Sequence, residues 1–451
     1  MSVYKTRRRI RGNNGSYHTV YEETSTDQVK HTDGTTAAGH IDSRVSSSSG
    51  AHGFRYNSET DALEVYNEST GQWVQAVSSV GGATVGNVSN ISTLPGNGSV
   101  YVKWTDPEDG GDLTPATWGG TLLVRKTGST PENRMDGTIV VDSKVRNAYA
   151  ESYFCDTGLT NGTVYYYKFF PYTTSNAYTN SPENAFTATP AASALNDVPW
   201  PYIKTISDNG LGADFWDIGD IKTILIHGPV GSSSFTNLSV SAFILSFSHN
   251  TAKEGDNRIH FQIGKINGVS VGLCDGMYGE IVSNYSAFNM NMSDSNAGGW
   301  ENSAMRKTLL GNSNTPSSPL AMSLMSALPS DLRGVMKAAT KYTDNTGGGA
   351  DASSYVTSTV EYLSLPSEYE VYGLRYLANS AEQTMQEQYE YYKTGNSKIA
   401  YHHSETSMSV AQWLRSPTAQ HDELFCSVYN DGRAMSGGAS VSRAIRPIFY
   451  V

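Results

Sequence analysis

Trp413-Leu414-Arg415-Ser416-Pro417 and, further on, Arg446-Pro447-Ile448-Phe449 frame the last part of a chain of 451 residues. Both stretches place an arginine beside large apolar side chains. This combination predicts buried strands whose arginines make charge-assisted hydrogen bonds. We therefore expect Trp413, Arg415 and Arg446 to be framework residues that hold the neighbouring loops, and not contacts for a ligand.

Two polar turns between these stretches contain the candidate ligand-binding residues. Their side chains offer directional hydrogen bonds together with a tyrosine ring, which suits recognition of a saccharide or a protein. The candidates are His421, Asp422, Glu423, Tyr429, Asn430, Asp431 and Arg433. Ordinary exposed turns remain the alternative, because Asn430-Asp431-Gly432 is also a strong hairpin signal.

The composition predicts several domains rich in β-structure, since a chain of this length exceeds one usual core. Charged residues make up only 17%, whereas there are 43 glycines and 28 tyrosines, which favours turns and strands with uncharged polar surfaces. The formal net charge is −11. Because like charges repel, we expect neither nucleic acid nor an anionic membrane to be a partner. The basic N-terminus is not followed by an apolar segment, so we expect no secretory signal and no membrane insertion.

The cysteines Cys155, Cys274 and Cys426 are too few, and odd in number, for a disulfide framework. We expect all three to be thiols, with Cys274 and Cys426 acting as small buried apolar residues. Assembly in a reducing cytosol fits this usage.

The first 80 residues are expected to form an arm and a small sheet. Residues 1–50 end in a serine-rich linker at 46–50, and within them residues 15–21 alternate like a strand, so we expect an extended N-terminal anchor arm. Residues 51–80 contain three short alternating segments separated by polar turns, which predicts a β-meander. Its aromatic face needs covering, which favours packing against other copies of the chain.

Residues 81–192 carry strand-like segments at regular spacing, which predicts an all-β sandwich. Trp104 ends the first strand pair, and Leu159 to Tyr165 reads Leu-Thr-Asn-Gly-Thr-Val-Tyr. This pattern resembles a fibronectin type III module and its tyrosine corner. The resemblance implies a hydrogen bond from Tyr165 to upstream backbone, a core position for Trp104, and a spacer that binds no ligand.

Residues 200–451 change in character and predict an α+β domain with much irregular chain. Strand-like segments at 223–226, 242–245 and 259–263 precede two helical stretches. We expect one helix to begin at Asn302-Ser303 and the other to run from about Ala321, break at Pro329 and restart at Ser330.

The stronger catalytic and metal signatures are missing from the sequence, so we expect no enzyme and no bound metal. Residues 268–272 match Gly-x-Ser-x-Gly, but a second β-like segment follows, which predicts a hairpin turn. His402 and His403 would point to opposite faces of a strand and so could not share an ion. Two acidic glycine-rich turns, 106–112 and 344–351, leave calcium open as a cofactor, with ordinary turns favoured.

The C-terminal half resembles a domain family common in phage tail and prophage proteins. The resemblance rests on separated motifs: Trp216 to Asp220, Phe247 to Asn250, Gly298 to Arg306 with Trp300 as a structural residue, Ala327 to Leu332, and Trp413 to Pro417. The pattern is similar to the C-type lectin fold of formylglycine-generating enzymes and phage receptor-binding proteins. It implies a rigid frame with ligand contacts near the carboxyl end.

The order of these parts suggests a virion protein assembled in the host cytoplasm. We expect a tail or head fibre, a homotrimer by its resemblance to fibres, that contacts other virion proteins through its N-terminus and a host-surface polysaccharide or protein through its last domain. A purely architectural capsid or tail component is the alternative. A polysaccharide-degrading enzyme is a third class, for which Glu361, Glu368, Glu370, Asp422 and Glu423 supply carboxylates but no evident pair.

Overall fold

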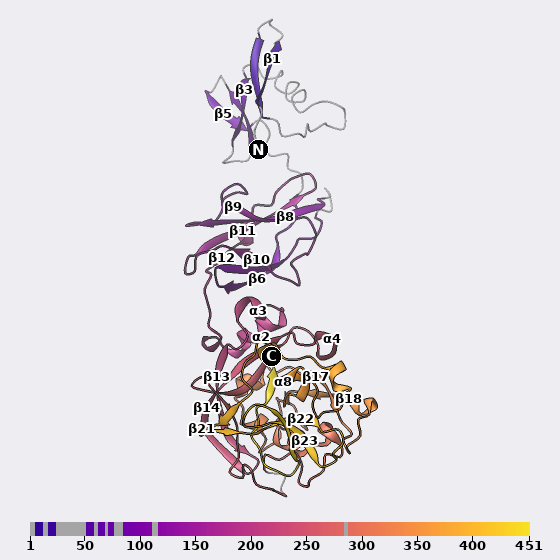
Figure 1. Ribbon diagram of the computed structural model, residues 1–451. Helices are drawn as coiled ribbons and strands as arrows, with labels where there is room; N and C mark the ends of the chain where they lie inside the picture. The colour runs from indigo at the N-terminus through magenta and orange to yellow at the C-terminus, as the bar shows by residue number, and fades with distance from the viewer. Residues whose placement is uncertain are drawn as a thin grey trace.

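The computed structural model describes residues 5–11, 17–23, 51–57, 62–67, 71–75, 84–110, 116–283 and 287–451. These ranges hold seven separate sheets, so the protein is multidomain and mainly β-structure. Figure 1 shows short N-terminal strands, a β-sandwich and a larger C-terminal region following one another along one direction.

The N-terminal strands form two small sheets. One is a hairpin of β1 (Lys5–Arg11) and β2 (Tyr17–Glu23), and the other is a meander of β3 (Ala51–Asn57), β4 (Ala62–Asn67) and β5 (Gln72–Gln75). The meander confirms the prediction from alternating residues, and Tyr66 lies 5.2 Å from Trp73 between ring centroids across it. Strand β1 was not expected from its run of basic residues. The serine-rich linker at 46–50 lies outside the described residues.

The sandwich consists of a three-stranded and a four-stranded antiparallel sheet. Their orders are β10-β7-β6 and β12-β11-β8-β9. The strands are β6 (Ser89–Gly96), β7 (Ser99–Thr105), β8 (Trp118–Thr127), β9 (Thr138–Ser143), β10 (Phe154–Thr157), β11 (Tyr165–Thr173) and β12 (Ala185–Ala188). Trp104 is 1% exposed and packs between Tyr149 and Phe169, with centroid distances of 4.7 and 4.8 Å. The predicted core role of Trp104 is therefore confirmed.

Two polar contacts lock this sandwich. The backbone N–H of Thr160 donates to the Tyr165 hydroxyl at 3.1 Å, which confirms the predicted bond to upstream backbone. Beneath Trp104, buried Asp106 accepts from the indole Nε1 at 2.9 Å and from the Thr121 hydroxyl at 2.6 Å. The carboxylate of Asp106, the first residue of the acidic turn 106–112, therefore accepts hydrogen bonds from core side chains, while residues 111 and 112 of that turn lie outside the described residues.

The C-terminal region is organised around one eight-stranded sheet. Six strands follow the order β13-β14-β15-β16-β20-β21, and β25 pairs with both β15 and β19. Two further sheets are β17-β18 and β22-β23-β24. The strands are β13 (Ile221–Val230), β14 (Ser233–Phe247), β15 (Ile259–Ile266), β16 (Val269–Gly272), β17 (Ala339–Asp344), β18 (Val356–Glu361), β19 (Leu363–Ser364), β20 (Ala400–His402), β21 (Glu405–Val410), β22 (Gln412–Pro417), β23 (Leu424–Val428), β24 (Ala434–Gly438) and β25 (Ile448–Tyr450).

Short helices accompany the sandwich, where the first of them packs against β11, and the C-terminal region. They are η1 (Pro182–Asn184), η2 (Leu195–Asp197), α2 (Trp200–Asp208), α3 (Gly212–Phe215), α4 (Thr251–Glu254), α5 (Gly299–Asn302), η3 (Met305–Leu309), α6 (Leu324–Ala327), α7 (Ser330–Arg333), η4 (Ser353–Tyr355), α8 (Glu368–Tyr372), α9 (Glu382–Met385) and α10 (Glu390–Lys393). Within the described ranges, none of these is long and apolar enough to cross a membrane. The predicted break at Pro329 and restart at Ser330 are confirmed. The helical stretch predicted after Asn302-Ser303 is confirmed as η3, whose Arg306 N–H donates to the Ser303 hydroxyl at 3.2 Å, although Asn302 itself ends α5.

Two hairpins follow directly from their turn residues. Asn267 and Gly268 both have positive φ, 48° and 81°, and join β15 to β16. This two-residue turn confirms that Gly268 to Gly272 is a hairpin and not a nucleophile turn. Gly432, with φ of 90°, similarly lies in the loop between β23 and β24.

The sandwich and the C-terminal region share apolar side chains where they meet. Leu94 and Tyr101 of the sandwich belong to the same buried cluster as Trp200. The ring of Tyr101 lies 5.2 Å from that of Phe215, and the Tyr202 hydroxyl donates to the Pro95 carbonyl at 3.2 Å. We call this contact the neck.

Candidate functional site

The seven candidate residues lie in two turns at opposite ends of β23. The first turn, residues 418–423, precedes β23, and the second, residues 429–433, follows it. The five residues of β23 span about 17 Å when extended. The turns therefore do not form the single patch that the sequence suggested. Figure 1 shows β22 and β23 in the part of the C-terminal region that lies away from the sandwich.

The first turn is fastened by Asn296, a buried side chain that the sequence analysis did not single out. Its amide donates to the carbonyls of His421 at 2.7 Å and Leu424 at 2.9 Å. Its Oδ1 accepts from the Gly348 N–H at 2.7 Å, and its own N–H donates to the Asp422 carbonyl at 2.6 Å. Asn296 thus joins the first turn to the glycine loop, residues 344–351, while the side chains of His421 and Asp422 remain exposed.

The glycine loop was the better of the two candidate calcium turns. Asp344 is 2% exposed, and its carboxylate accepts from the Gly347 N–H at 2.7 Å and the Asn379 amide at 2.9 Å. Asp351 accepts from the Ser380 N–H at 2.6 Å and pairs with Arg375 at 3.1 Å. Both carboxylates therefore already accept hydrogen bonds that hold the loop in its shape. A calcium ion would have to displace those donors.

A polar hollow of about 490 Å³ lies next to the first turn. Ser295 and Ala297, on either side of Asn296, belong to its wall. The other lining residues are mainly amides, hydroxyls and one amine: Asn291, Met292, Ser293, Asn302, Ala304, Lys307 and Thr308. The Lys307 ammonium donates to the Asn302 amide oxygen at 2.6 Å, which orients both groups. Such a lining can hydrogen-bond to a hydroxyl-rich ligand, and nothing in the local sequence pattern had marked it.

The second turn has a cationic and aromatic surface. Arg433 lies over the Tyr429 ring, 4.8 Å from its centroid, and its Nε is 3.4 Å from the Asp431 carboxylate. The Tyr372 hydroxyl donates to the Gly432 carbonyl at 3.0 Å and so supports the turn from below. Arg433 and Asp431 are exposed, whereas Tyr429 is partly buried. The turn is thus held in one shape with polar groups facing outward.

The predicted framework role is confirmed for Trp413 and Arg415. Trp413 is 1% exposed and donates from its indole to the Phe288 carbonyl at 3.0 Å. Arg415 is fully buried, donates to the Leu365 carbonyl at 2.9 Å and forms a bidentate pair with Glu370. The loops on both sides of β22 are therefore tied to its buried side chains.

The pair of Arg415 and Glu370 continues into a buried ionic network. Lys341 donates to Glu370 at 3.0 Å and to the Tyr389 hydroxyl at 2.8 Å, and it also pairs with Glu254. Burial alone would raise the pKa of Glu370. The charges of Arg415 and Lys341 outweigh burial and hold that pKa well below its usual range. Glu370 is therefore ionised.

Arg446 does not behave as the sequence suggested. It is 1% exposed, but none of its three guanidinium nitrogens has a hydrogen-bond partner among the described residues. Its contact is instead with the face of Phe243, 5.5 Å from the ring centroid. The expectation of charge-assisted bonds is therefore wrong for Arg446, whose guanidinium lies against an aromatic face without a hydrogen-bond partner among the described residues.

Three of the five carboxylates considered for sugar cleavage are structural. Glu361 is fully buried and accepts from Trp300 at 3.0 Å and Arg306 at 2.6 Å. Trp300 is itself fully buried, which confirms its structural role. Glu368 is also fully buried and accepts from backbone N–H groups, such as that of Ala378 at 2.9 Å, while Glu370 belongs to the ionic network. None of these three can contact an external saccharide.

His249, Glu254 and His260 lie close enough to resemble a metal cluster; one ring nitrogen of each histidine has a polar partner, whereas His249 Nδ1 and His260 Nε2 have no hydrogen-bond partner among the described residues. The His249 Nε2 is 3.1 Å from the Glu387 carbonyl, and the His260 Nδ1 is 3.2 Å from the Tyr389 hydroxyl. The Lys341 ammonium already contacts the Glu254 carboxylate. A second cation there would face strong repulsion. This cluster is part of the buried network.

His402 and His403 lie side by side, contrary to the prediction. Their ring centroids are 4.8 Å apart and their planes differ by 20°. Strand β20 ends at His402 and its pairing with β21 is irregular there, so the alternation of a regular strand no longer applies. Both rings line a hollow of about 460 Å³, which also includes Cys274, Tyr278 and Glu405. We call it the Cys274 pocket.

The surroundings of the Cys274 thiol do not activate it as a nucleophile. Burial, with a smaller effect of Asp275, raises the pKa of Cys274 to about 12. Burial and then His402 lower the pKa of His403 to about 4. A protonated thiol beside a neutral imidazole is not an activated pair. Cys274, Cys426 and Cys155 are all free, as predicted.

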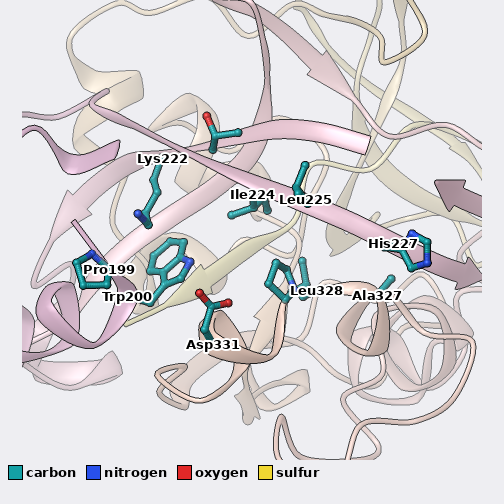
Figure 2. A pocket seen from close by; sticks show the side chains of 11 residues that line it. Pro199, Trp200, Lys222, Ile224, Leu225, His227, Ala327, Leu328 and Asp331 are labelled. Atoms are coloured by element: carbon teal, nitrogen blue, oxygen red, sulfur yellow. The ribbon is translucent and has the colours of Figure 1, made fainter. Parts of the chain in front are cut away.

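A further hollow of about 400 Å³ lies between β13 and the α6–α7 segment (Figure 2). Its wall is largely apolar and includes Trp200, Leu225 and Leu328. Lys222 lies over the Trp200 ring at 5.2 Å and donates to the Val198 carbonyl, and Asp331 lines the opposite side. The charged groups therefore serve the local packing.

Comparison with known proteins gives one family match. Residues 279–451 match a family described as a domain of unknown function, DUF6273. The matched stretch contains both turns, the polar hollow, Arg415 and the two adjacent histidines, but not Cys274. No curated protein matches the chain.

Proposed function

We propose that the protein is a structural component of a virion, a tail or head fibre that attaches to the particle through its N-terminal strands and adheres to the host surface through its C-terminal region. Assembly would take place in the host cytoplasm. The bound host component would be a surface polysaccharide or protein, with hydrogen bonding as the main source of specificity.

The observation that carries this proposal is the polar hollow beside the first turn. Its amide, hydroxyl and amine groups match the hydrogen-bonding groups of a saccharide. The adjoining first turn exposes His421 and Asp422 on a backbone that Asn296 fixes. A preorganised polar surface loses little entropy on binding.

The arrangement of the chain supports the same proposal. The ends of the C-terminal region meet on one side, because the Ser207 hydroxyl donates to the Val451 carbonyl. Helix α2, which contains Ser207, lies next to the sandwich, whereas β22 and β23 lie farther from it (Figure 1). The strands that border the candidate turns are thus farther from the sandwich than α2 is.

We propose finer fold assignments on the same basis. The strand orders β10-β7-β6 and β12-β11-β8-β9, together with the bond between Thr160 and Tyr165, support a fibronectin type III module as spacer. Buried motif residues Trp300, Trp413 and Arg415 around mixed sheets support a C-type-lectin-like frame. The aromatic meander of β3, β4 and β5 supports self-association, for which a homotrimer is our proposal.

The direct test is binding of the full chain to host cells and to their isolated surface polysaccharide. Binding that saturates, and that the free polysaccharide competes away, is the expected result. An antibody against the C-terminal region should also reach its epitope on intact particles. A masked epitope together with no cell binding would support a purely architectural role instead.

A further inference from the structure

The topology brings Cys274 next to two histidines that are far away in the sequence. Strand β16 pairs in parallel with β20, so that Gly272 is opposite His402. The His403 N–H donates to the Gly272 carbonyl at 3.2 Å, and the Cys274 N–H donates to the His403 Nδ1 at 3.2 Å. These backbone contacts fix three side chains with metal-ligating atoms around one point.

The spacing of these atoms is close to that of a metal site. One ligand atom from each of Cys274, His402 and His403 lies within 4.8 Å of the other two. A tetrahedral zinc ion with bonds of about 2.0 to 2.3 Å needs ligand atoms about 3.5 Å apart. Side-chain rotations would have to bring these atoms together, and the two histidine ring centroids start 4.8 Å apart.

The surroundings suit an ion that keeps one open position. The three residues line a hollow of about 460 Å³ together with Asp275, Tyr278 and Glu405. Cys274 is 2% exposed, whereas both histidines are partly exposed. The thiol therefore lies at the buried end of the pocket, and the two imidazole rings lie nearer to its opening. A water molecule or a small ligand could complete the coordination from the open side.

We propose that Cys274, His402 and His403 bind a divalent transition metal ion of the zinc class. One thiolate and two imidazoles favour such an ion over calcium or magnesium, which prefer oxygen ligands. On binding, the S–H bond breaks, a bond from sulfur to the metal forms, and the proton passes to solvent. The site is independent of the proposed host adhesion.

Polar neighbours already orient both histidine rings. The His402 Nδ1 lies 2.9 Å from the Ser404 hydroxyl and 3.2 Å from the Ser404 N–H, and the His403 Nδ1 accepts from the Cys274 N–H at 3.2 Å. An ion bound through either Nδ1 would replace these hydrogen bonds and would find the rings already oriented.

Cobalt(II) titration of the reduced full chain tests this proposal, because cobalt reports its ligands through its absorption spectrum. We expect one cobalt ion per chain, a thiolate-to-cobalt charge-transfer band, and displacement of the cobalt by zinc. Cys274→Ser should remove the charge-transfer band. The double variant His402→Ala, His403→Ala should lose stoichiometric binding, and His421→Ala is the matched control that should retain it.

Cys155→Ser tests the choice of thiol and should leave the band unchanged. If Cys274→Ser fails to fold, as judged by circular dichroism, the histidine double variant decides, because its side chains are only partly buried. A full chain that shows no charge-transfer band at stoichiometric cobalt would overturn the proposal. So would a band that survives in Cys274→Ser or in the histidine double variant.

Discussion

Arg415 and Glu370 form a bidentate ion pair in which both side chains are fully buried. The pair joins β22 to α8, and Glu370 also closes the capping box of α8 with Ser367. Removal of the arginine would leave a charged carboxylate in the core beside Lys341. Substitution of the arginine would therefore leave an unpaired charge inside the frame around the two turns.

Arg415→Met is expected to lower the free energy of unfolding by about 3 to 5 kcal/mol, because it breaks a buried ion pair and keeps the other charge. Chemical denaturation measures the change. Arg433→Met is the matched control, since Arg433 lies on the surface, and its effect should stay within about 0.5 kcal/mol. A loss below about 1 kcal/mol for Arg415→Met would contradict the described network.

Asn296→Ala should release the first turn from the glycine loop. The substitution removes donors to the His421 and Leu424 carbonyls and the acceptor of the Gly348 N–H. We expect a loss of about 2 to 4 kcal/mol, since several buried groups lose their partners. Hydrogen exchange should increase at Gly348, whereas Asn302→Ala, an exposed neighbour, should leave exchange there unchanged.

Glu382 should make stability depend on pH near neutrality. Burial raises the pKa of Glu382 to about 7, against the opposing hydrogen bond from Ser416, while the reference value is 4.5. The native state then holds an extra proton between these values, so stability falls as pH rises through this window. The loss amounts to about 3 kcal/mol at most.

Glu382→Gln cannot titrate, so the difference in unfolding free energy between wild type and variant should shift across that window. Glu301→Gln, an exposed carboxyl, should show no such shift. A constant difference between wild type and Glu382→Gln from pH 4.5 to 8 would show that the carboxyl remains charged in the native protein. Below this range, Glu370 acts with the opposite sign, because its lowered pKa makes stability fall as pH decreases.

Tyr165→Phe should weaken the sandwich by about 1 kcal/mol, because it removes the acceptor of the Thr160 N–H. Thermal unfolding of the full chain, followed by near-ultraviolet circular dichroism, measures the change. Tyr166→Phe is the control, since neighbouring residues of a strand point to opposite faces. Equal effects of the two substitutions would contradict a specific role for this bond.

If the protein binds the host surface as proposed, variants of the polar hollow and of the second turn should separate the contributions of these two surfaces. If the polar hollow is the contact, the double variant Asn302→Ala, Lys307→Ala should weaken binding to host polysaccharide at least about tenfold, as expected for two lost hydrogen bonds. Tyr429→Ala with Arg433→Ala tests the second turn. Lys144→Ala, whose side chain is exposed on the sandwich, should bind like wild type.

The sequence was most informative where a local signal determines the structure. Asn267-Gly268 and Asn430 to Gly432 predict hairpins because these residue types favour positive φ. Tyr165 predicts a tyrosine corner because of the residues from Leu159 that precede it. Each of these depends on residues close in the chain. They could be predicted because backbone conformation and spacing act over a few residues.

The features that could not be predicted depend on contacts between distant segments. Asn296 bonds to residues more than a hundred positions away, and its surroundings in the sequence give no sign of that role. His402 and His403 face the same pocket because a strand ends irregularly between them, which alternation alone cannot reveal. Arg446 shows the same limit, since its aromatic surroundings come from other strands.

The shared packing at the neck has a mechanical consequence. Leu94 and Tyr101 lie in one apolar cluster with Trp200, so the two parts cannot swing apart without exposing that cluster to water. A force applied to the C-terminal region would therefore reach the sandwich through packed side chains, and the relative orientation of the two parts should persist under load.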